Sequence, residues 1–207
     1  MKFPEFKITN YHILISHRYY RSEEYRRLVS MLERQSARDS KWKWTNRSIP
    51  VEQPISMTDS KGRLRNYIHV MQEHMSDIHA ILMVMRDEWI EDIHGQYEEL
   101  TEAAKPPYRP NIPIVSVLPR GGSFESLEHG ILGTPVRWNS SSIVSKIKEV
   151  AIPASPEELQ LTKAQNNERN QIVQVLKNNR GSMAAAALAL GISVSTLRRR
   201  RIYYIIR

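Results

Sequence analysis

Three short, nearly continuous apolar segments constrain the fold of this chain most strongly. They are Tyr11–Ser16 (YHILIS), Asp77–Met85 (DIHAILMVM) and Ile112–Leu118 (IPIVSVL). Segments of this length without regular polar alternation are typical of strands that are buried on both faces of a sheet. Because helix-patterned stretches separate them, the sequence predicts a parallel sheet that is covered by helices on both sides.

Two shorter strands and four helices complete this predicted α/β part. The strands are Lys41–Thr45 (KWKWT) and Pro135–Trp138. The expected helices, in which apolar residues recur at helical spacing, are Ser22–Arg34, Lys61–Met75, Trp89–Lys105 and Ser140–Val150. Five strands connected in this way favour a flavodoxin-like doubly wound sheet. Ligands bind such sheets at the carboxyl ends of the strands, which predicts a site built from Ser16–Arg18, the loop after Trp44 and the segment after Met85.

The composition excludes several classes of protein. There is no cysteine, so disulfides and thiolate zinc sites are excluded and a reducing cytoplasm fits. No apolar run approaches the roughly 20 residues of a membrane span, and the N-terminus does not have the pattern of a signal peptide. The chain lacks GxGxxG, P-loop and HExxH motifs, and its seven histidines show no metal-ligand spacing. We therefore expect a cytoplasmic protein with no membrane partner and no metal site.

The excess of positive charge is concentrated near the C-terminus. The whole chain has a net charge of +8, and residues 156–207 hold nine Lys/Arg against three Asp/Glu. No acidic residue follows Glu168. A local basic excess of this kind points to a polyanionic partner such as DNA, RNA or an acidic membrane.

A change of composition separates the α/β part from the basic part. Residues 151–160 (AIPASPEELQ) contain two prolines and several small residues, which is typical of a domain boundary. We expect an α/β domain over residues 1–150, a linker over 151–165 and a small all-α domain over 166–207.

The C-terminal segment has the pattern of a helix-turn-helix. A first helix is expected over Asn167–Asn179, with an apolar face that includes Ile172, Val173, Val175 and Leu176. Arg180-Gly181 ends it, and Ser182 can cap a second helix over Met183–Leu190. Gly191 suits the sharp turn that follows, and Ser193 can cap a third helix that contains four consecutive arginines. Val194 and Leu197 would face inward on that helix.

This stretch resembles the Fis-type helix-turn-helix found at the C-terminus of many bacterial regulators. The matching residues are Gly181, Ala185–Ala187, Leu190–Ser193 and Thr196–Arg199. The resemblance implies that the third helix faces DNA, with Ser193, Ser195, Thr196, Arg198, Arg199 and Arg200 as the DNA-binding residues. Arg201 departs from the family, which usually has an apolar residue there. The residues leave two alternatives open: the helix is simply a solvated basic helix, or it binds RNA or a membrane surface instead of DNA.

The first 140 or so residues contain blocks that resemble bacterial TIR-like domains, the flavodoxin-like family that includes components of Thoeris anti-phage systems. The blocks are Ile13–His17, Trp44–Pro50 with Pro54, Asn111–Val117 and Pro135–Ser142. The resemblance implies a nucleotide site, with NAD or a related nucleotide as substrate or ligand. Its nucleotide-binding residues would be Ser16, His17, Arg18, Trp44, Asn46 and Ser48. Ser16 and Asn46 can equally cap turns, and His17 can equally be an ordinary loop residue.

The resemblance also implies a catalytic glutamate on the helix that follows the middle strand. Glu99 stands at the expected position, with Glu98 as the alternative. A carboxylate beside the ribose can stabilise the positive charge that develops as nicotinamide leaves. The chain departs from the family motif, because Trp89 lies too far upstream and no serine stands at the expected place. Both glutamates also fit a solvated helix face.

Three functions follow from these features. The first is a DNA-binding transcription regulator that forms a homo-oligomer and whose TIR-like domain binds or processes a nucleotide. The resemblance implies a role for it in antiviral defence. The second is a TIR-like NAD hydrolase or cyclase that makes a nucleotide signal. The third is a non-enzymatic TIR-like adaptor that self-associates.

Overall fold

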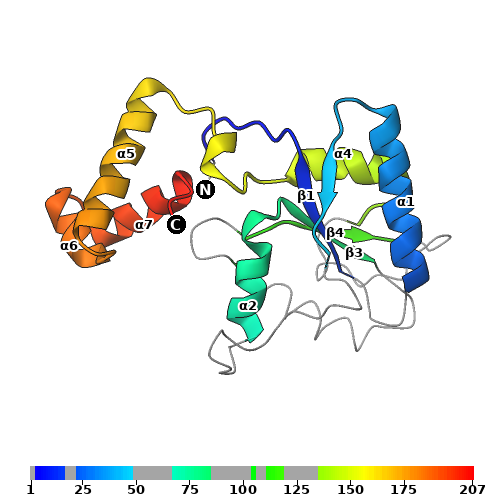
Figure 1. The fold of residues 1–207 in the computed structure, drawn as a ribbon, viewed down its shortest axis with the longest axis horizontal. Coiled ribbons are helices and arrows are strands. Elements are labelled where there is room, and N and C mark those ends of the chain that lie inside the picture. The colour runs from blue at the N-terminus through cyan, green and yellow to red at the C-terminus, as the bar shows by residue number, and fades with distance from the viewer. Residues whose placement is uncertain (1–2, 17–21, 49–66, 85–103, 106–110, 119–134) are drawn as a thin grey trace. The chain divides into compact units, whose positions relative to one another are not determined.

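The computed structural model describes residues 3–16, 22–48, 67–84, 104–105, 111–118 and 135–207. The helices and strands, labelled in Figure 1, are β1 (Tyr11–Ser16), α1 (Ser22–Arg38), β2 (Trp44–Asn46), α2 (Tyr67–His74), β3 (Ala80–Val84), β4 (Ile114–Val117), α4 (Ser140–Val150), α5 (Lys163–Asn178), α6 (Met183–Ala189) and α7 (Val194–Tyr203). The chain forms two compact units. We call residues 9–106 and 111–152 the α/β unit, and residues 1–8, 107–110 and 153–207 the helical unit.

The α/β unit is built on a four-stranded sheet. The strand order is β2-β1-β3-β4, and all three pairs of neighbours run parallel. Leu14 of β1 lies opposite Ile81 of β3, and Leu82 of β3 lies opposite Val115 of β4. Parallel neighbours require crossover connections, which is why the chain alternates strands with helices.

Both faces of this sheet are covered. Three consecutive residues of β1, Ile13–Ile15, and four of β3, Ala80–Met83, are buried. Successive side chains of a strand point to opposite faces, so burial of consecutive residues requires cover on both sides. Figure 1 shows α1 and α2 flanking the strands on opposite sides. The predicted α/β class with a parallel sheet is therefore correct.

The second strand begins later than the sequence pattern predicts. The prediction was Lys41–Thr45, whereas β2 spans Trp44–Asn46. A turn occupies the first positions: the Asp39 carboxylate accepts the Lys41 backbone N–H (2.9 Å), and the Trp42 N–H donates to the Asp39 carbonyl (2.9 Å). Trp42 enters the core with none of its surface exposed and packs on the Tyr11 ring instead of pairing in the sheet.

Two other predicted strands also differ by a few residues from what the structure shows. The segment Pro135–Trp138, which we expected to be a strand, contributes one parallel bridge between Val136 and Val117. The third strand starts at Ala80 and not at Asp77, because Met75–Asp77 forms a 3-10 turn. The helix expected over Trp89–Lys105 lies almost entirely outside the described residues.

The helical unit contains α5, α6 and α7. Helix α5 begins at Lys163, four residues before the prediction, because Thr162 and Gln165 form a capping box there. Residues 156–158 form a 3-10 turn, which is closed by a second capping box between Ser155 and Glu158. Val173, which we placed on the apolar face of this helix, is 38% exposed.

Candidate nucleic-acid interface

The three helices of the helical unit pack around one apolar cluster. The buried members are Ile172, Leu176, Ala186, Ala187, Leu197, Tyr204 and Ile206. Ala186 and Ala187 lie in the middle of α6, where small side chains allow its neighbours to approach closely. The run of four alanines therefore has a structural cause, as close packing requires small side chains on at least one partner.

The turn between α6 and α7 has a defined geometry. Gly191 has a φ of 65°, in the left-handed region, and its N–H donates to the Leu188 carbonyl (3.0 Å). The N–H of Ile192 donates to the Ala187 carbonyl (3.0 Å), and the Ile192 side chain packs against the apolar cluster. These two bonds form a Schellman motif, which ends α6 at a fixed residue and sets the direction of the chain into α7.

Ser193 begins α7 as its N-cap. Its Oγ accepts the backbone N–H of Thr196 (3.1 Å) and lies 2.9 Å from the hydroxyl of Ser195 and 2.8 Å from that of Thr196. The Ser193 hydroxyl is therefore used within the helix end, where a side-chain acceptor satisfies a backbone donor that no helical partner can reach.

One face of α7 is exposed and basic. Leu197 is fully buried, and Val194 packs against the apolar cluster, as their spacing predicts. Ser195, Arg198 and Arg199 are exposed. The structure thus places these three predicted DNA-binding residues together on the side of α7 that does not pack against the helical unit.

Arg200 has a different environment from its two predecessors. It forms an ion pair with Glu168 of α5, and its side chain is 43% exposed. The hydroxyl of Tyr204, the residue that follows α7, donates to the other oxygen of the same carboxylate. Burial raises the pKa of Tyr204 above its ordinary value, because ionisation would place a charge in a desolvated site.

Arg201 is turned towards the interior of the helical unit. Its Nη1 donates to the Met183 sulfur (3.3 Å) and its Nε to the Ile206 carbonyl (3.3 Å). A guanidinium therefore occupies the position where an apolar side chain was expected from the family pattern. Its stem crosses the α6–α7 contact, while its donors satisfy a carbonyl beyond the helix end.

The described nucleotide-site candidates make contacts within the α/β unit. Ser16 ends β1, opposite Met83 of β3. The Ser48 hydroxyl accepts the Ile15 N–H (2.9 Å), and the Asn46 amide donates to the Tyr25 hydroxyl (2.7 Å). Trp44 is half-buried at the start of β2. His17, Arg18 and Glu99 lie outside the described residues, as does Glu98.

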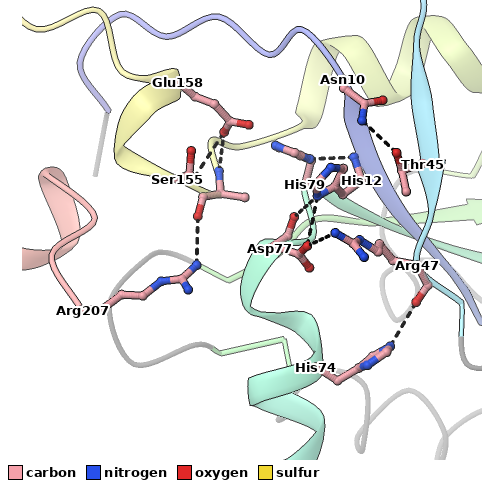
Figure 2. A network of polar contacts seen from close by, with 11 residues as sticks. Asn10, His12, Thr45, Arg47, His74, Asp77, His79, Ser155, Glu158 and Arg207 are labelled. Atoms are coloured by element: carbon pink, nitrogen blue, oxygen red, sulfur yellow. Dashed lines mark hydrogen bonds and ion pairs between the residues drawn. The ribbon is translucent and has the colours of Figure 1, made fainter.

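A polar network lies at the ends of β1, β2 and β3, where sequence patterns gave no signal (Figure 2). The Asp77 carboxylate contacts Arg47 Nη2 (2.6 Å) and His12 Nδ1 (3.2 Å). The His12 backbone N–H donates to Nδ1 of His79 (2.8 Å), and His79 is only 1% exposed. His74 Nε2 lies 3.1 Å from the Arg47 carbonyl. These residues join the ends of three strands and a helix, so the network stabilises the sheet.

Within the described ranges, no group of three or more His, Cys, Asp or Glu side chains is arranged to hold a metal ion. None of the helices built from described residues is long and apolar enough to cross a membrane.

Comparison with known proteins identifies one segment of the chain. Residues 165–202, which span α5, α6 and most of α7, match the family model described as bacterial regulatory protein, Fis family. No curated protein and no solved structure matches the chain, and these comparisons do not support the resemblance of the α/β unit to TIR-like domains. The geometry of α6 and α7 and this match agree: the C-terminal segment of the chain is a Fis-type helix-turn-helix, a domain that indicates a DNA-binding regulator.

Proposed function

We propose that this chain regulates transcription by binding duplex DNA through α7. The observation that carries the proposal is the exposed face of α7, where Ser195, Arg198 and Arg199 are open to solvent while Leu197 is buried on the opposite face. In a helix-turn-helix the second helix enters the major groove and presents its first turns to the base edges. Arg side chains there can bind guanine O6 and N7 bidentately, and hydroxyls reach phosphates or bases.

Five of the six candidate residues would then have the following unequal roles. Arg198 and Arg199 would contact bases or phosphates directly, and Ser195 would contact a phosphate near the start of α7. Ser193 would act mainly as the helix cap, because its hydroxyl is bound within α7. Thr196 is only half-exposed, so we assign it a contact at the edge of the interface.

Duplex binding at several salt concentrations tests this function. Replacing Arg198 or Arg199 by Gln should weaken binding roughly tenfold each, if the side chain contacts a base. A lost phosphate contact should also reduce the slope of log K against log salt by about 0.9. Lys43→Gln removes an exposed cation from the α/β unit and is the matched control. Equal affinity for all three variants and the parent would contradict the proposal.

We further propose that the α/β unit is a flavodoxin-like sensor that binds a ligand at the carboxyl ends of β1 and β3. Two observations support this. The order β2-β1-β3-β4, followed by the parallel bridge at Val136, has the sequence of a 2-1-3-4-5 sheet. In such a sheet the strand order reverses between β1 and β3, where ligands bind. Ser16 stands at that point, opposite Met83.

The TIR-like resemblance suggests NAD or a related nucleotide as the ligand, and leaves an NAD hydrolase or cyclase as the second candidate function. We propose that ligand binding in residues 1–150 alters how the helix-turn-helix domains, residues 166–207, are spaced in a homodimer, with residues 151–165 as the connection. Half-site reading is geometric, so a change in spacing would change DNA affinity.

NAD consumption by the purified chain, with products resolved by mass, separates the sensor from the enzyme. Turnover in the parent that Glu99→Ala abolishes would make the chain an enzyme and identify its carboxylate. Saturable binding without turnover would support the sensor. Self-association with neither NAD binding nor NAD turnover would instead support an adaptor. A role in phage defence would be tested separately by infection assays.

A further inference from the structure

The four consecutive arginines of α7 are held in three different ways. Arg198 and Arg199 are exposed, Arg200 is paired with Glu168, and Arg201 is bound to Met183 and the Ile206 carbonyl. From the sequence alone, all four would be taken as phosphate ligands, whereas in the structure Arg198 and Arg199 lie on the exposed face and Arg200 and Arg201 contact other described residues. Glu168, the partner of Arg200, therefore affects how much positive charge α7 can present to DNA of any sequence.

Glu168 has an unusual position for a residue in a basic domain. It is the only acidic residue between Leu159 and Arg207, where nine Lys and Arg are found. It lies in the second turn of α5, and its carboxylate contacts Arg200 of α7 and Tyr204, which follows α7, at the same time. A carboxylate beside a DNA-binding helix repels phosphate, and it also draws away one cation that would otherwise attract phosphate.

The two contacts of Glu168 have separate consequences. The bond from the buried Tyr204 hydroxyl fixes the carboxylate against the apolar cluster, because Tyr204 is 2% exposed and belongs to that cluster. A second polar contact, from the Gln165 amide to the Tyr203 hydroxyl (3.2 Å), joins the same two helices one turn away. Glu168 is thus held in place by Tyr204, and it holds Arg200 in turn.

We propose that Glu168 is a specificity-determining residue that restrains Arg200 and so limits sequence-independent binding to phosphate. Sequence-independent affinity depends on the number of cations that neutralise phosphates, whereas specific affinity depends on contacts to base edges. Withholding one arginine lowers the first quantity and leaves the base contacts of Arg198 and Arg199 intact. The ratio of specific to non-specific affinity rises as a result. This inference rests on the proposed DNA-binding function.

Replacing Glu168 by Gln tests the inference in the full chain. The glutamine carbonyl still accepts the Tyr204 hydroxyl and the side-chain volume is kept, but the charge that holds Arg200 is gone. Affinity for a random-sequence duplex should rise about two- to fivefold at low salt, the size of a partly exposed ion pair. The slope of log K against log salt should steepen by about 0.9, which corresponds to one added phosphate contact. Affinity for a site selected from a randomised duplex pool should change less.

Two controls isolate the role of Arg200. Glu149→Gln frees Lys146 of α4 from an exposed ion pair, so it makes the same change of charge in the α/β unit. It should leave the slope unchanged. The double variant Glu168→Gln with Arg200→Gln should return the slope to the parental value, because the released cation is then absent.

Arg200→Gln in the parental background provides a readout that does not depend on how Glu168→Gln folds. Its salt slope should match that of the parent, while Arg199→Gln should have a shallower slope. If Arg200→Gln reduces the slope as much as Arg199→Gln, Arg200 already contacts phosphate and the inference is wrong, although the proposed function stands. If the parent binds no duplex at all, the proposed function itself is overturned, and this inference falls with it.

Discussion

His12 and His79 are joined by two hydrogen bonds, one between their backbones and one from the His12 backbone to the His79 side chain. The His12 N–H donates to Nδ1 of His79 (2.8 Å), and the His79 N–H donates to the His12 carbonyl (2.8 Å). A buried imidazole therefore takes the place of a backbone carbonyl where β1 and β3 begin to pair. Because Nδ1 accepts, the ring nitrogen that carries hydrogen in this geometry is Nε2.

Removing that acceptor should destabilise the α/β unit. His79→Leu leaves the His12 N–H without its partner, which costs roughly 1–3 kcal/mol. His79→Asn can place an amide oxygen near the former Nδ1 and should be milder. All four tryptophans, at positions 42, 44, 89 and 138, belong to this unit, so urea unfolding followed by tryptophan fluorescence reports on it alone. Equal stability of the two variants would contradict the proposed role of Nδ1.

The turn at Gly191 should tolerate substitution poorly. Gly191→Ala must adopt a φ near 65°, which costs an L-residue roughly 1–2 kcal/mol. Among the described residues, no atom beyond the glycine and its two chain neighbours lies within 4 Å of the added Cβ, so the cost is conformational and not steric. Asparagine tolerates this region better, and Gly191→Asn should lose less stability. Far-UV circular dichroism during thermal unfolding would measure both. A fully stable Gly191→Ala variant would argue against the left-handed turn.

Tyr204 should make the helical unit sensitive to alkali. Burial, followed by the neighbouring Tyr203, raises the pKa of Tyr204 above its ordinary value of 10.0. A group whose pKa is raised by folding contributes its stability fully below the unfolded pKa and loses it as pH rises through the folded pKa. The parent should therefore lose helical content above about pH 10 more steeply than Tyr204→Phe, which has no proton to release. Parallel curves for the two proteins would exclude this coupling.

Asp39 should make the stability of the α/β unit sensitive to acid, whereas Tyr204 makes the helical unit sensitive to alkali. The Lys41 backbone N–H and then the Lys148 ammonium, 3.1 Å away, lower the pKa of this carboxyl below its ordinary 3.8. A lowered pKa contributes stability above the unfolded pKa, and this stability is lost as pH falls through the folded value. Asp39→Asn keeps an oxygen for the Lys41 N–H but cannot titrate, so its stability should vary less with pH below about 4. Urea titrations read by the buried Trp42 would show the difference, and an unchanged pH profile would contradict it.

The sequence was sufficient to predict the elements whose pattern is local. Runs of apolar residues located β1, β3 and β4, and the serine caps and Gly191 located α6 and α7. Local pattern was misleading where a turn competes with a strand. The alternation in KWKWT suggested sheet pairing for Trp42, but a turn closed by Asp39 directs that indole into the core. Likewise, Pro135–Trp138 has a strand-like composition but pairs at a single position.

The candidate interface was predictable in outline but not in its distribution of charge. Helical spacing is enough to separate Leu197 from Arg198 and Arg199. The fate of Arg200 and Arg201 depends on residues 18 to 32 positions away, Glu168 and Met183, and no periodicity within α7 reveals them. The one available signal was the isolation of Glu168 among basic residues, which shows that a carboxylate is present but not which arginine it contacts.

The burial of Leu197 has a consequence for how α7 can be altered. A helix turns by about 100° per residue, so inserting a single alanine after Val194 would rotate every later side chain by that angle. The net charge and the string of four arginines would be unchanged, and the composition would differ by one alanine. Thr196 would then take the place of Leu197 next to the apolar cluster, and the leucine would move to the solvent-exposed place of Arg198. A flexible polybasic segment would bind DNA equally well before and after such an insertion. In α7, by contrast, the angular position of each residue decides whether it packs or is exposed, so the insertion would disrupt both the packing of the helix and its exposed basic face.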